Sequence, residues 1–388
     1  MRMVKNIVLL GSTGSIGRNT LAVLRENRQF FRLLGLAAGA NSQLLGQQVA
    51  EFDPPLLCVK SKKHALELSE QHPGKKIFFG EEGLLEIVSQ PGIDYVVAAV
   101  TGTTALAATL QAIRLNMRLC LANKETLVVA GELINRELNA SRAEIIPIDS
   151  EQSAIFQCLA SRPREHVRRV ILTASGGPFF RDGRRDFAAI GVEEALAHPT
   201  WSMGKKISID SATLMNKALE IIEAHHLFKL PPEQIEVLIH PQSIVHSMVE
   251  FVDSAVLAQL GVPDMKLPIL YSLSHPGRID GHWPDLDLTR IPPLEFFKVD
   301  RRRFPSIALA YDVLTQGQDA GAVFNSANET AVEYFLAGRI SFAQIFSVVG
   351  HMLEGWDFRP AQTLADIQET ISRARLKTVE HIETEVMK

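Results

Sequence analysis

Short apolar runs alternate with amphipathic segments along the first 150 residues of the chain. The mainly apolar runs predict strands over Lys5–Leu10, Arg32–Ala38, Leu56–Val59, Ile93–Val100 and Arg118–Ala122. Helical patterns lie between them, for example over Ile16–Asn27 and Thr103–Leu115. Strands that are apolar throughout are buried on both faces, as in a parallel sheet with right-handed helical crossovers. The pattern therefore predicts an α/β chain that begins with a doubly wound, Rossmann-like domain over residues 1–150.

The rest of the chain has a different rhythm. Residues 151–275 carry strand-like runs that surround a helical pattern beginning near Asp210, which predicts a central α+β catalytic domain; the runs are Val167–Thr173, Ile235–Ile239 and Ser254–Leu260. Residues 276–305 hold five prolines and few apolar repeats, so we expect a linker there. Residues 306–388 are helical in pattern and predict a C-terminal helical bundle, with helix ends at Gly317, Gly338 and Gly350.

Composition narrows the function classes. With 388 residues the chain is long enough for two or three domains, and 46% hydrophobic residues are typical of a globular protein. A net charge of −4 with interspersed acids and bases favours neither a nucleic-acid nor a membrane surface as partner. No apolar run approaches the roughly 18 residues of a membrane span. The three scattered cysteines form no CxxC motif, and we expect a cytoplasmic protein.

A glycine-rich turn follows the first predicted strand and opens a helix. Gly11, Gly14 and Gly17 have the spacing GxxGxxG, and in this context they favour a dinucleotide site over a tight turn without ligand. No acid lies between Glu26 and Glu51, where an NAD site places one for the ribose diol, so NADP(H) is the expected nucleotide. The chain also has no Arg or Lys from residue 33 to residue 59. Polar groups near residues 41 and 42 are the expected partners of the 2′-phosphate.

Two carboxylates follow another apolar run, Ile145–Ile148. Asp149 and Glu151 are two residues apart, and on a strand such residues point to the same side. On the helix expected after Asp210, Glu220 shares one arc with an amide and an amine. Three converging carboxylates favour a hard divalent cation. The alternative is an ordinary ion pair and a favourable charge at a helix N-terminus.

Further polar residues point to an anionic substrate. Ser211, Asn216 and Lys217 form a cradle for a phosphate or a sugar hydroxyl, with Asp210 or Ser211 as the expected N-cap of the helix. The loop "ASGGPF" exposes backbone N–H groups and the hydroxyl of Ser175. The segment 197–206 is either a lid over the ligand or an exposed loop. Pairs of histidines offer a zinc alternative, but their spacings match no standard zinc pattern, and structural roles are expected; they are His225, His226, His240 and His246.

The combination of "GSTGSIG", "ANKE", "DSE", "ASGGPF", "HPTWSMGKKISIDSATLMNKALE", "HPQSIVHSM" and "PDMKLPI" resembles the 1-deoxy-D-xylulose 5-phosphate reductoisomerase family, in order along nearly the whole chain. The resemblance implies conversion of 1-deoxy-D-xylulose 5-phosphate to 2-C-methyl-D-erythritol 4-phosphate by isomerisation and reduction, a step of non-mevalonate isoprenoid biosynthesis. It implies NADPH together with Mg²⁺, Mn²⁺ or Co²⁺, and a homodimer.

The resemblance also implies roles for individual residues. The metal ligands would be Asp149, Glu151 and Glu220. Catalytic roles would fall to Lys124, Glu151 and His198. Substrate would be bound by Lys124, Ser150, Glu151, Ser175, His198, Trp201, Ser211, Asn216, Lys217 and Glu220. NADPH would be bound by Thr13, Gly14, Ser15, Ile16, Gly39, Ala40, Asn41, Asn123, Glu125 and Gly204. Many family members carry a polar residue where Ala40 stands and His where Gln152 stands, so no proton-transfer role is assigned to Gln152.

Two other functions compete with this hypothesis. A plain NADP-dependent reductase of a phosphorylated aldehyde would need no carboxylate cluster, and a chelator would leave its activity intact. An NADPH-sensing regulator would bind the nucleotide without consuming it.

Overall fold

The computed structural model describes residues 4–39, 41–159, 162–183, 185–197 and 203–387. The chain forms two compact units. The first comprises Met1–Thr126, Ile134–Phe156 and Asp264–Pro284, and the second comprises Leu127–Leu133, Gln157–Pro263 and Asp285–Lys388. The boundaries expected at residues 150, 275 and 305 stay a prediction. None of the described helices is both long and apolar enough to cross a bilayer.

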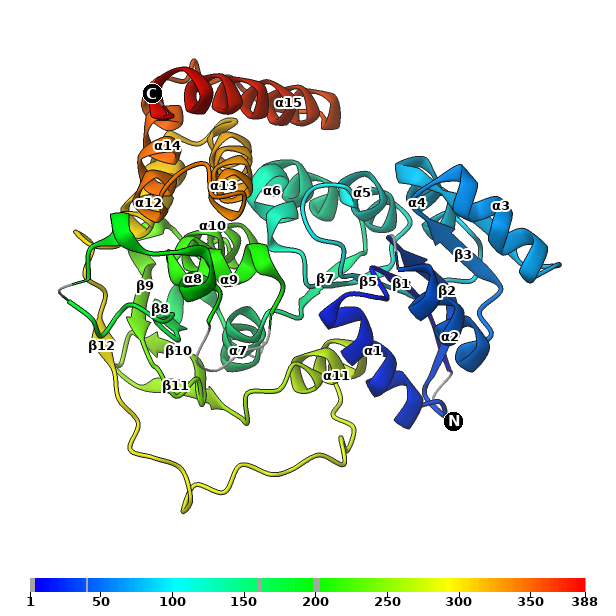
Figure 1. Ribbon diagram of the computed structural model, residues 1–388. Coiled ribbons are helices and arrows are strands. Elements are labelled where there is room, and N and C mark those ends of the chain that lie inside the picture. Colours follow the sequence, from blue (N-terminus) through cyan, green and yellow to red (C-terminus); the bar gives the residue numbers. More distant parts are fainter. Residues whose placement is uncertain (1–3, 40, 160–161, 184, 198–202, 388) are drawn as a thin grey trace. The chain divides into compact units, whose positions relative to one another are not determined.

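The first unit is built on a parallel sheet with the order β4-β3-β2-β1-β5-β6-β7, blue to cyan in Figure 1. Its strands are β1 (Lys5–Leu10), β2 (Phe31–Ala38), β3 (Leu56–Val59), β4 (Lys76–Phe79), β5 (Tyr95–Ala98), β6 (Arg118–Leu121) and β7 (Glu144–Pro147). Its helices include α1 (Ser15–Glu26), α2 (Ser42–Phe52), α3 (Lys62–Gln71), α4 (Gly80–Val88), α5 (Leu106–Arg114) and α11 (Lys266–Ser274). Helix α6 (Lys124–Asn139) contributes to both units. Strand order reverses direction on either side of β1, as in a doubly wound sheet.

One face of this sheet is covered by α1, α2, α3 and α11. Their apolar side chains pack in one cluster with the inward residues of β1 and β3, for example Leu24, Leu45, Leu68 and Leu270 with Leu9. Burial of such a leucine is worth about 2 kcal/mol. The continuous apolar strands are therefore explained by helices on the sheet, as the sequence predicted.

The second unit contains a mixed sheet with the order β11-β10-β8-β9-β12. Its strands are β8 (Val167–Ala174), β9 (Ile235–Ile239), β10 (Val245–Phe251), β11 (Val256–Leu260) and β12 (Phe297–Lys298). Strands β8 and β9 are parallel, and the other pairs are antiparallel. The short helix α8 (Val192–Leu196) is followed by α9 (Lys205–Ala212) and α10 (Met215–Phe228), and α7 (Ser150–Leu159) leads into this unit. Single turns of 3₁₀-helix occur at Arg164–His166, Phe187–Ala189 and Pro232–Gln234.

The C-terminal helices, orange to red in Figure 1, belong to the second unit. They are α12 (Ser306–Gln316), α13 (Ala320–Leu336), α14 (Phe342–Glu354) and α15 (Leu364–His381), followed by a π-helical turn over Ile382–Val386. Helix α13 packs against α12, α14 and α15, and most of its residues are buried.

The expected fold class is confirmed, with corrections of detail. Gly317 and Gly338 follow helices with positive φ, as expected, but Gly350 lies inside α14, which continues to Glu354. Asp210 and Ser211 are not N-caps, because they lie in α9, and Leu214 with φ of 55° separates α9 from α10. The strands β4, β10 and β12 were not expected.

Candidate active site

The glycine loop joins the end of β1 to α1 at the point where the strand order reverses. Gly11 has φ of 90°, and a Cβ atom there would stand 2.4 Å from the carbonyl oxygen of Ala99, so only glycine fits. The backbone N–H groups of Gly11 and Ser12 donate to the carbonyl of Ala37, which ties the loop to the end of β2. Gly14 is the N-cap of α1 and offers no side-chain cap. The first N–H groups of α1 therefore face the position where a Rossmann-like fold holds a pyrophosphate.

Asn123 joins two neighbouring loops of the same sheet edge. Its Oδ1 accepts a hydrogen bond from the N–H of Thr126 and caps α6, while its Nδ2 donates to the carbonyls of Val100 and Gly102 at 2.6 and 2.9 Å. The same amide donates to Glu125 Oε2 at 3.1 Å. The loops after β5 and β6 are thereby held in one arrangement.

The residues expected to contact NADPH in the first unit follow three strands at one edge of the sheet, β2, β1 and β6. Gly39 and Asn41 follow β2, residues 13–16 follow β1, and Asn123 and Glu125 follow β6, one strand beyond β5. Since neighbouring strands are about 4.8 Å apart, this row spans about 14 Å from β2 to β6, which suits an extended dinucleotide. Gly204 is the N-cap of α9 in the second unit.

Lys124, which follows β6, and Asp149, which follows β7, form a buried ion pair. The partners Leu121 and Pro147 align β6 with β7, and the N–H of Ile148 donates to the carbonyl of Leu121 at 2.8 Å. Lys124 opens α6 and Asp149 precedes α7, so strand pairing places the ammonium beside the carboxylate. The side chains are 9% and 13% exposed, which strengthens their attraction.

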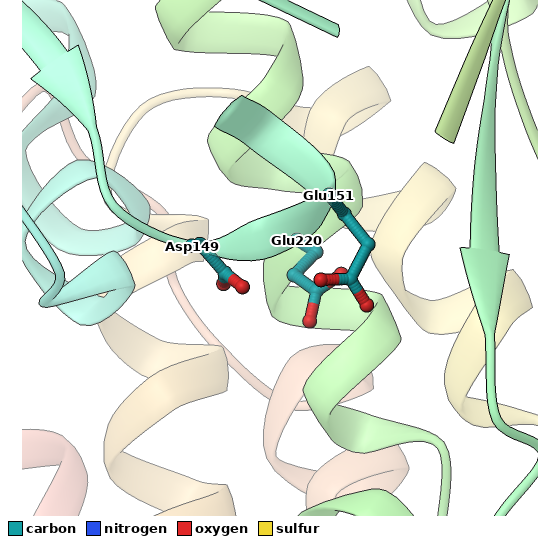
Figure 2. A group of neighbouring side chains, drawn as sticks. All are labelled: Asp149, Glu151 and Glu220. Atoms are coloured by element: carbon teal, nitrogen blue, oxygen red, sulfur yellow. The ribbon is translucent and has the colours of Figure 1, made fainter. Parts of the chain in front are cut away.

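Figure 2 shows three carboxylates pointing toward one another: those of Asp149, Glu151 and Glu220. Each offers one oxygen, and these oxygens all lie within 4.8 Å of one another. The strand argument for the first two is wrong, because β7 ends at Pro147 and α7 begins at Ser150. The N–H of Ser153 donates to the carbonyl of Asp149, so the turn into α7 brings the two carboxylates to one side.

Glu220 lies on α10 and is fully buried. Asn216 Nδ2 donates to its Oε1 at 2.5 Å, and Lys217 Nζ forms an ion pair with its Oε2. Both partners lie on the same helical arc, as expected from the spacing. Ser150 Oγ donates to Glu151 Oε2 at 2.5 Å. Each carboxylate is thus oriented by a neighbouring donor.

This donor set fits a hard divalent cation. The cluster combines three carboxylates with two ammonium groups, so it keeps a negative charge to attract a cation. Carboxylate oxygens are the ligands that a hard cation such as Mg²⁺ takes, and three of them leave coordination positions for water or substrate oxygens.

Two histidines of the zinc alternative, His225 and His240, make hydrogen bonds with the backbone. His240 Nε2 accepts from the N–H groups of Ile244 and Val245, and its Nδ1 lies 2.9 Å from the carbonyl of Glu295. His225 Nδ1 lies 2.7 Å from the carbonyl of Leu230. Within the described residues, no histidine belongs to the metal-ligating group. The expectation of structural roles agrees with these contacts for His225 and His240, and it stays a prediction for His226 and His246.

In the second unit, Gly177 brings two serine-bearing segments together. It has φ of 63°, and a Cβ atom there would lie 2.8 Å from the carbonyl oxygen of Ser211. The N–H of Gly177 also donates to Ser175 Oγ at 3.4 Å. The loop after β8 therefore packs directly against α9, so the backbone of the Ser175 loop touches that of Ser211.

The structure adds a contact that sequence reasoning missed. Asp210 is 1% exposed, accepts a hydrogen bond from Asn328 Nδ2 on α13 at 2.8 Å and pairs with Lys206 Nζ at 2.9 Å. It fixes α9, and with it Ser211, to the C-terminal helices. The available signal was the group Asn325, Ser326 and Asn328, which places three polar side chains within one turn of a helical pattern that is apolar before it. Ala40, His198 and Trp201 lie outside the described residues.

Comparison with known proteins gives the family of this chain. Family models match as 1-deoxy-D-xylulose 5-phosphate reductoisomerase over residues 7–131, as the C-terminal domain of that enzyme over residues 145–228, and as a DXP reductoisomerase C-terminal domain over residues 260–377. The chain is 45% identical over 371 residues to the 1-deoxy-D-xylulose 5-phosphate reductoisomerase of Prosthecochloris aestuarii, covering 95% of this chain and 96% of that protein. It is 46% identical over 374 residues to that of Citrifermentans bemidjiense, with 96% of each covered.

Solved structures agree over the full length. One is a crystal structure of DOX-P reductoisomerase in complex with NADPH, fosmidomycin and magnesium, with a TM-score of 0.93, 39% identity and 98% of each chain covered. Another is the reductoisomerase of Zymomonas mobilis in complex with NADPH, with a TM-score of 0.93, 38% identity, and 98% of this chain and 100% of that chain covered. With the glycine loop, the carboxylate cluster and these matches in agreement, the chain belongs to the 1-deoxy-D-xylulose 5-phosphate reductoisomerase family.

Proposed function

We propose that this protein converts 1-deoxy-D-xylulose 5-phosphate to 2-C-methyl-D-erythritol 4-phosphate with NADPH and a divalent cation, in non-mevalonate isoprenoid biosynthesis. The family carries this assignment, and one observation supports it directly. The expected nucleotide row and the carboxylates of Asp149 and Glu151 share the carboxyl edge of one sheet, in the strand order β2-β1-β5-β6-β7. A reduced nicotinamide and a metal-held substrate need this proximity.

Divalent metal is proposed at Asp149, Glu151 and Glu220, supported by the approach of their oxygens to within 4.8 Å. A cation bound there supplies Lewis-acid stabilisation of the negative charge that develops on substrate oxygens during the rearrangement. The protein groups around it are set in advance. Ser150 orients Glu151, and Asn216 and Lys217 orient Glu220.

NADPH, proposed to lie along the glycine loop and Asn123, supplies the hydride that reduces the rearranged aldehyde. Lys124 is proposed as a catalytic group because its ammonium lies beside Asp149 and is almost fully enclosed. An ammonium held this way can donate a hydrogen bond or a proton to a substrate oxygen. His198 and Trp201 remain proposed substrate contacts from the family resemblance.

The substrate phosphate is proposed to contact Ser175, Ser211, Asn216 and Lys217. The close packing of the Ser175 loop on α9 supports a shared site for the two hydroxyls, and Lys217 provides the positive charge. Hydrogen bonds from an ammonium to a phosphate are among the stronger ones in proteins.

The test is product identification with purified protein. NADPH consumption is followed with 1-deoxy-D-xylulose 5-phosphate, and the product is identified by NMR, with Mg²⁺ and then with excess EDTA. We expect 2-C-methyl-D-erythritol 4-phosphate only with metal. Activity that survives EDTA, or a reduced but unrearranged sugar, would instead support the plain reductase. Nucleotide binding without consumption would support the regulator.

We also propose a homodimer through strand β11. This strand ends the sheet of the second unit, and among the described residues β10 is its one partner strand. It exposes Val256, Leu257 and Leu260 at 49%, 38% and 36%. Exposed apolar edge strands invite pairing with another chain. Light scattering should give twice the chain mass, and Leu257→Lys should shift the protein toward the monomer. A monomeric wild-type protein would refute the dimer.

The cytoplasm is the proposed compartment. Its reducing conditions suit three buried free thiols, those of Cys58, Cys120 and Cys158. Fractionation of the producing cell would test this location.

A further inference from the structure

A groove of about 290 Å³ lies between α2 and α3, at the carboxyl edge of the first unit's sheet. Gly39, Ser42 and Gln43 line it from the β2–α2 side, and Val59, His64 and Glu67 line it from the β3–α3 side. In a Rossmann-like fold the ribose of the adenosine half lies at the end of β2. The groove therefore begins where the 2′ position of that ribose is expected.

Strand register brings a basic segment to this place. Ala38 pairs with Val59 across β2 and β3, so Gly39 and Lys60 leave the sheet side by side, about 4.8 Å apart. The sequence has no Arg or Lys from residue 33 to residue 59, and Lys60 lies 21 positions after Gly39. Its proximity to the end of β2 follows from strand pairing and could not be predicted from the sequence.

The two loops differ sharply in charge. The segment from Gly39 to Glu51 has no charged side chain before its final residue, whereas Lys60, Lys62 and Lys63 follow β3 within four residues. Ser61 caps α3 by accepting a hydrogen bond from the N–H of His64 at 3.4 Å. The positive end of the α3 dipole thus adds to the lysine charges on this side of the groove.

His64 faces the groove directly from the first turn of α3. Its side chain is partly buried and lines the groove opposite Ser42. An imidazole N–H and a serine hydroxyl are both donors to a phosphate oxygen. The one acid of the lining, Glu67, lies one turn further along α3 and is 4.0 Å from the ammonium of Lys63, which offsets its charge.

We infer that Lys60 and His64, with Ser42 opposite, bind the 2′-phosphate of NADPH and set the preference for NADPH over NADH. This inference rests on the proposed use of NADPH. The two nucleotides differ only by that phosphate, which carries close to two negative charges. In a Rossmann-like fold, the residues that distinguish the two nucleotides usually follow β2. Here the donors that recognise the 2′-phosphate follow the neighbouring strand β3, on the segment that leads into α3.

The test measures nucleotide binding to the full-length protein by isothermal titration calorimetry, without substrate. The probes are NADPH, NADH, and the fragments 2′,5′-ADP and 5′-AMP. Loss of one charge-assisted hydrogen bond corresponds to a factor of roughly 10 to 100 in affinity. We expect Lys60→Ala and His64→Ala each to weaken NADPH and 2′,5′-ADP by about 10-fold or more while NADH and 5′-AMP change less than about 2-fold.

Two further variants sharpen the result. Lys76→Ala removes one lysine at the start of β4, the opposite edge of the sheet, and should leave all four affinities unchanged. Glu67→Gln removes the negative charge of the lining and should tighten NADPH by a few-fold without affecting NADH. Unchanged NADH binding shows that each variant is folded.

The outcomes separate this inference from the proposed function. If the wild-type protein binds NADPH no better than NADH, the proposed cofactor is wrong. If it prefers NADPH and the Lys60→Ala and His64→Ala variants keep that preference, the cofactor stands and the assignment of these residues is overturned.

Discussion

Replacing Glu220 by glutamine removes one charge from the carboxylate cluster and keeps the shape of the side chain. The Lys217 ammonium, 3% exposed, then loses its ion pair with Glu220. Breaking such a pair costs about 3 kcal/mol, which for a unit of some 200 residues lowers Tm by about 6–12 °C. We expect this loss in metal-free protein at neutral pH.

The same variant should also lose the response to metal. A cation that binds the folded state at about 100 times its Kd stabilises the wild-type protein by about 2.7 kcal/mol. Thermal unfolding is measured with EDTA and with Mn²⁺ or Mg²⁺, and we expect Glu220→Gln to show little or none of this increment.

Glu223→Gln is the matched control. Glu223 is equally buried on α10, three residues further along, and lies outside the carboxylate cluster. This variant also replaces a buried carboxyl group by an amide, but it should keep the full increment from metal. If Glu220→Gln gains as much stability from metal as the wild-type protein does, Glu220 is not a ligand of the cation.

Three more predictions concern the interior. Asn328→Leu should destabilise the protein by about 1–3 kcal/mol in urea unfolding, because Asp210 loses a buried hydrogen-bond donor. Asn325→Leu should be neutral or stabilising, because the buried amide of Asn325 has no hydrogen-bond partner among the described residues. A larger loss of stability in Asn325→Leu than in Asn328→Leu would contradict these contacts. Burial raises the pKa of the Cys120 thiol to about 12. In the native protein Cys120 should therefore not react with a disulfide reagent at pH 8, and rapid labelling of this residue would contradict its burial. Burial lowers the pKa of His226 to about 3, so between about pH 6.5 and 3 the unfolded chain binds a proton that the folded protein does not. Acidification from neutral pH to pH 5 should therefore lower the free energy of unfolding by about 2 kcal/mol, and His226→Phe should lessen this loss. An unchanged dependence of stability on pH in that variant would contradict the prediction.

The sheet of the first unit was predictable because its central strands are buried on both faces and read as continuous apolar runs. Edge strand β4 escaped notice because its four residues, KIFF, are partly exposed and lie beside lysines. Strand β10 was missed for another reason. His246 and Ser247 interrupt its apolar pattern although both are buried, so local hydrophobicity understates its place in the sheet.

Helix ends were predicted less well than helices. Glycine favours a helix end only where the chain needs positive φ, and Gly350 does not need it because α14 continues past it. The break between α9 and α10 is made by Leu214 in the left-handed region, which its residue type gives no reason to expect.

Only part of the candidate site could be predicted from the sequence. Helical spacing alone brought Asn216 and Lys217 to Glu220, because neighbours at i, i+3 and i+4 share a face. The pairing of Lys124 with Asp149, and of Lys60 with the end of β2, depends on which strands are adjacent. Such adjacency is set by tertiary packing and leaves no local pattern in the sequence.

Asp149, Glu151 and Glu220 are proposed to bind one divalent cation together. Titration with Mn²⁺, followed by electron paramagnetic resonance of the free ion, measures this without substrate or turnover. We expect one tightly bound Mn²⁺ per chain, lost in Asp149→Asn and Glu220→Gln and retained in Glu223→Gln. Equal Mn²⁺ binding by the wild-type protein and all three variants would contradict this proposal.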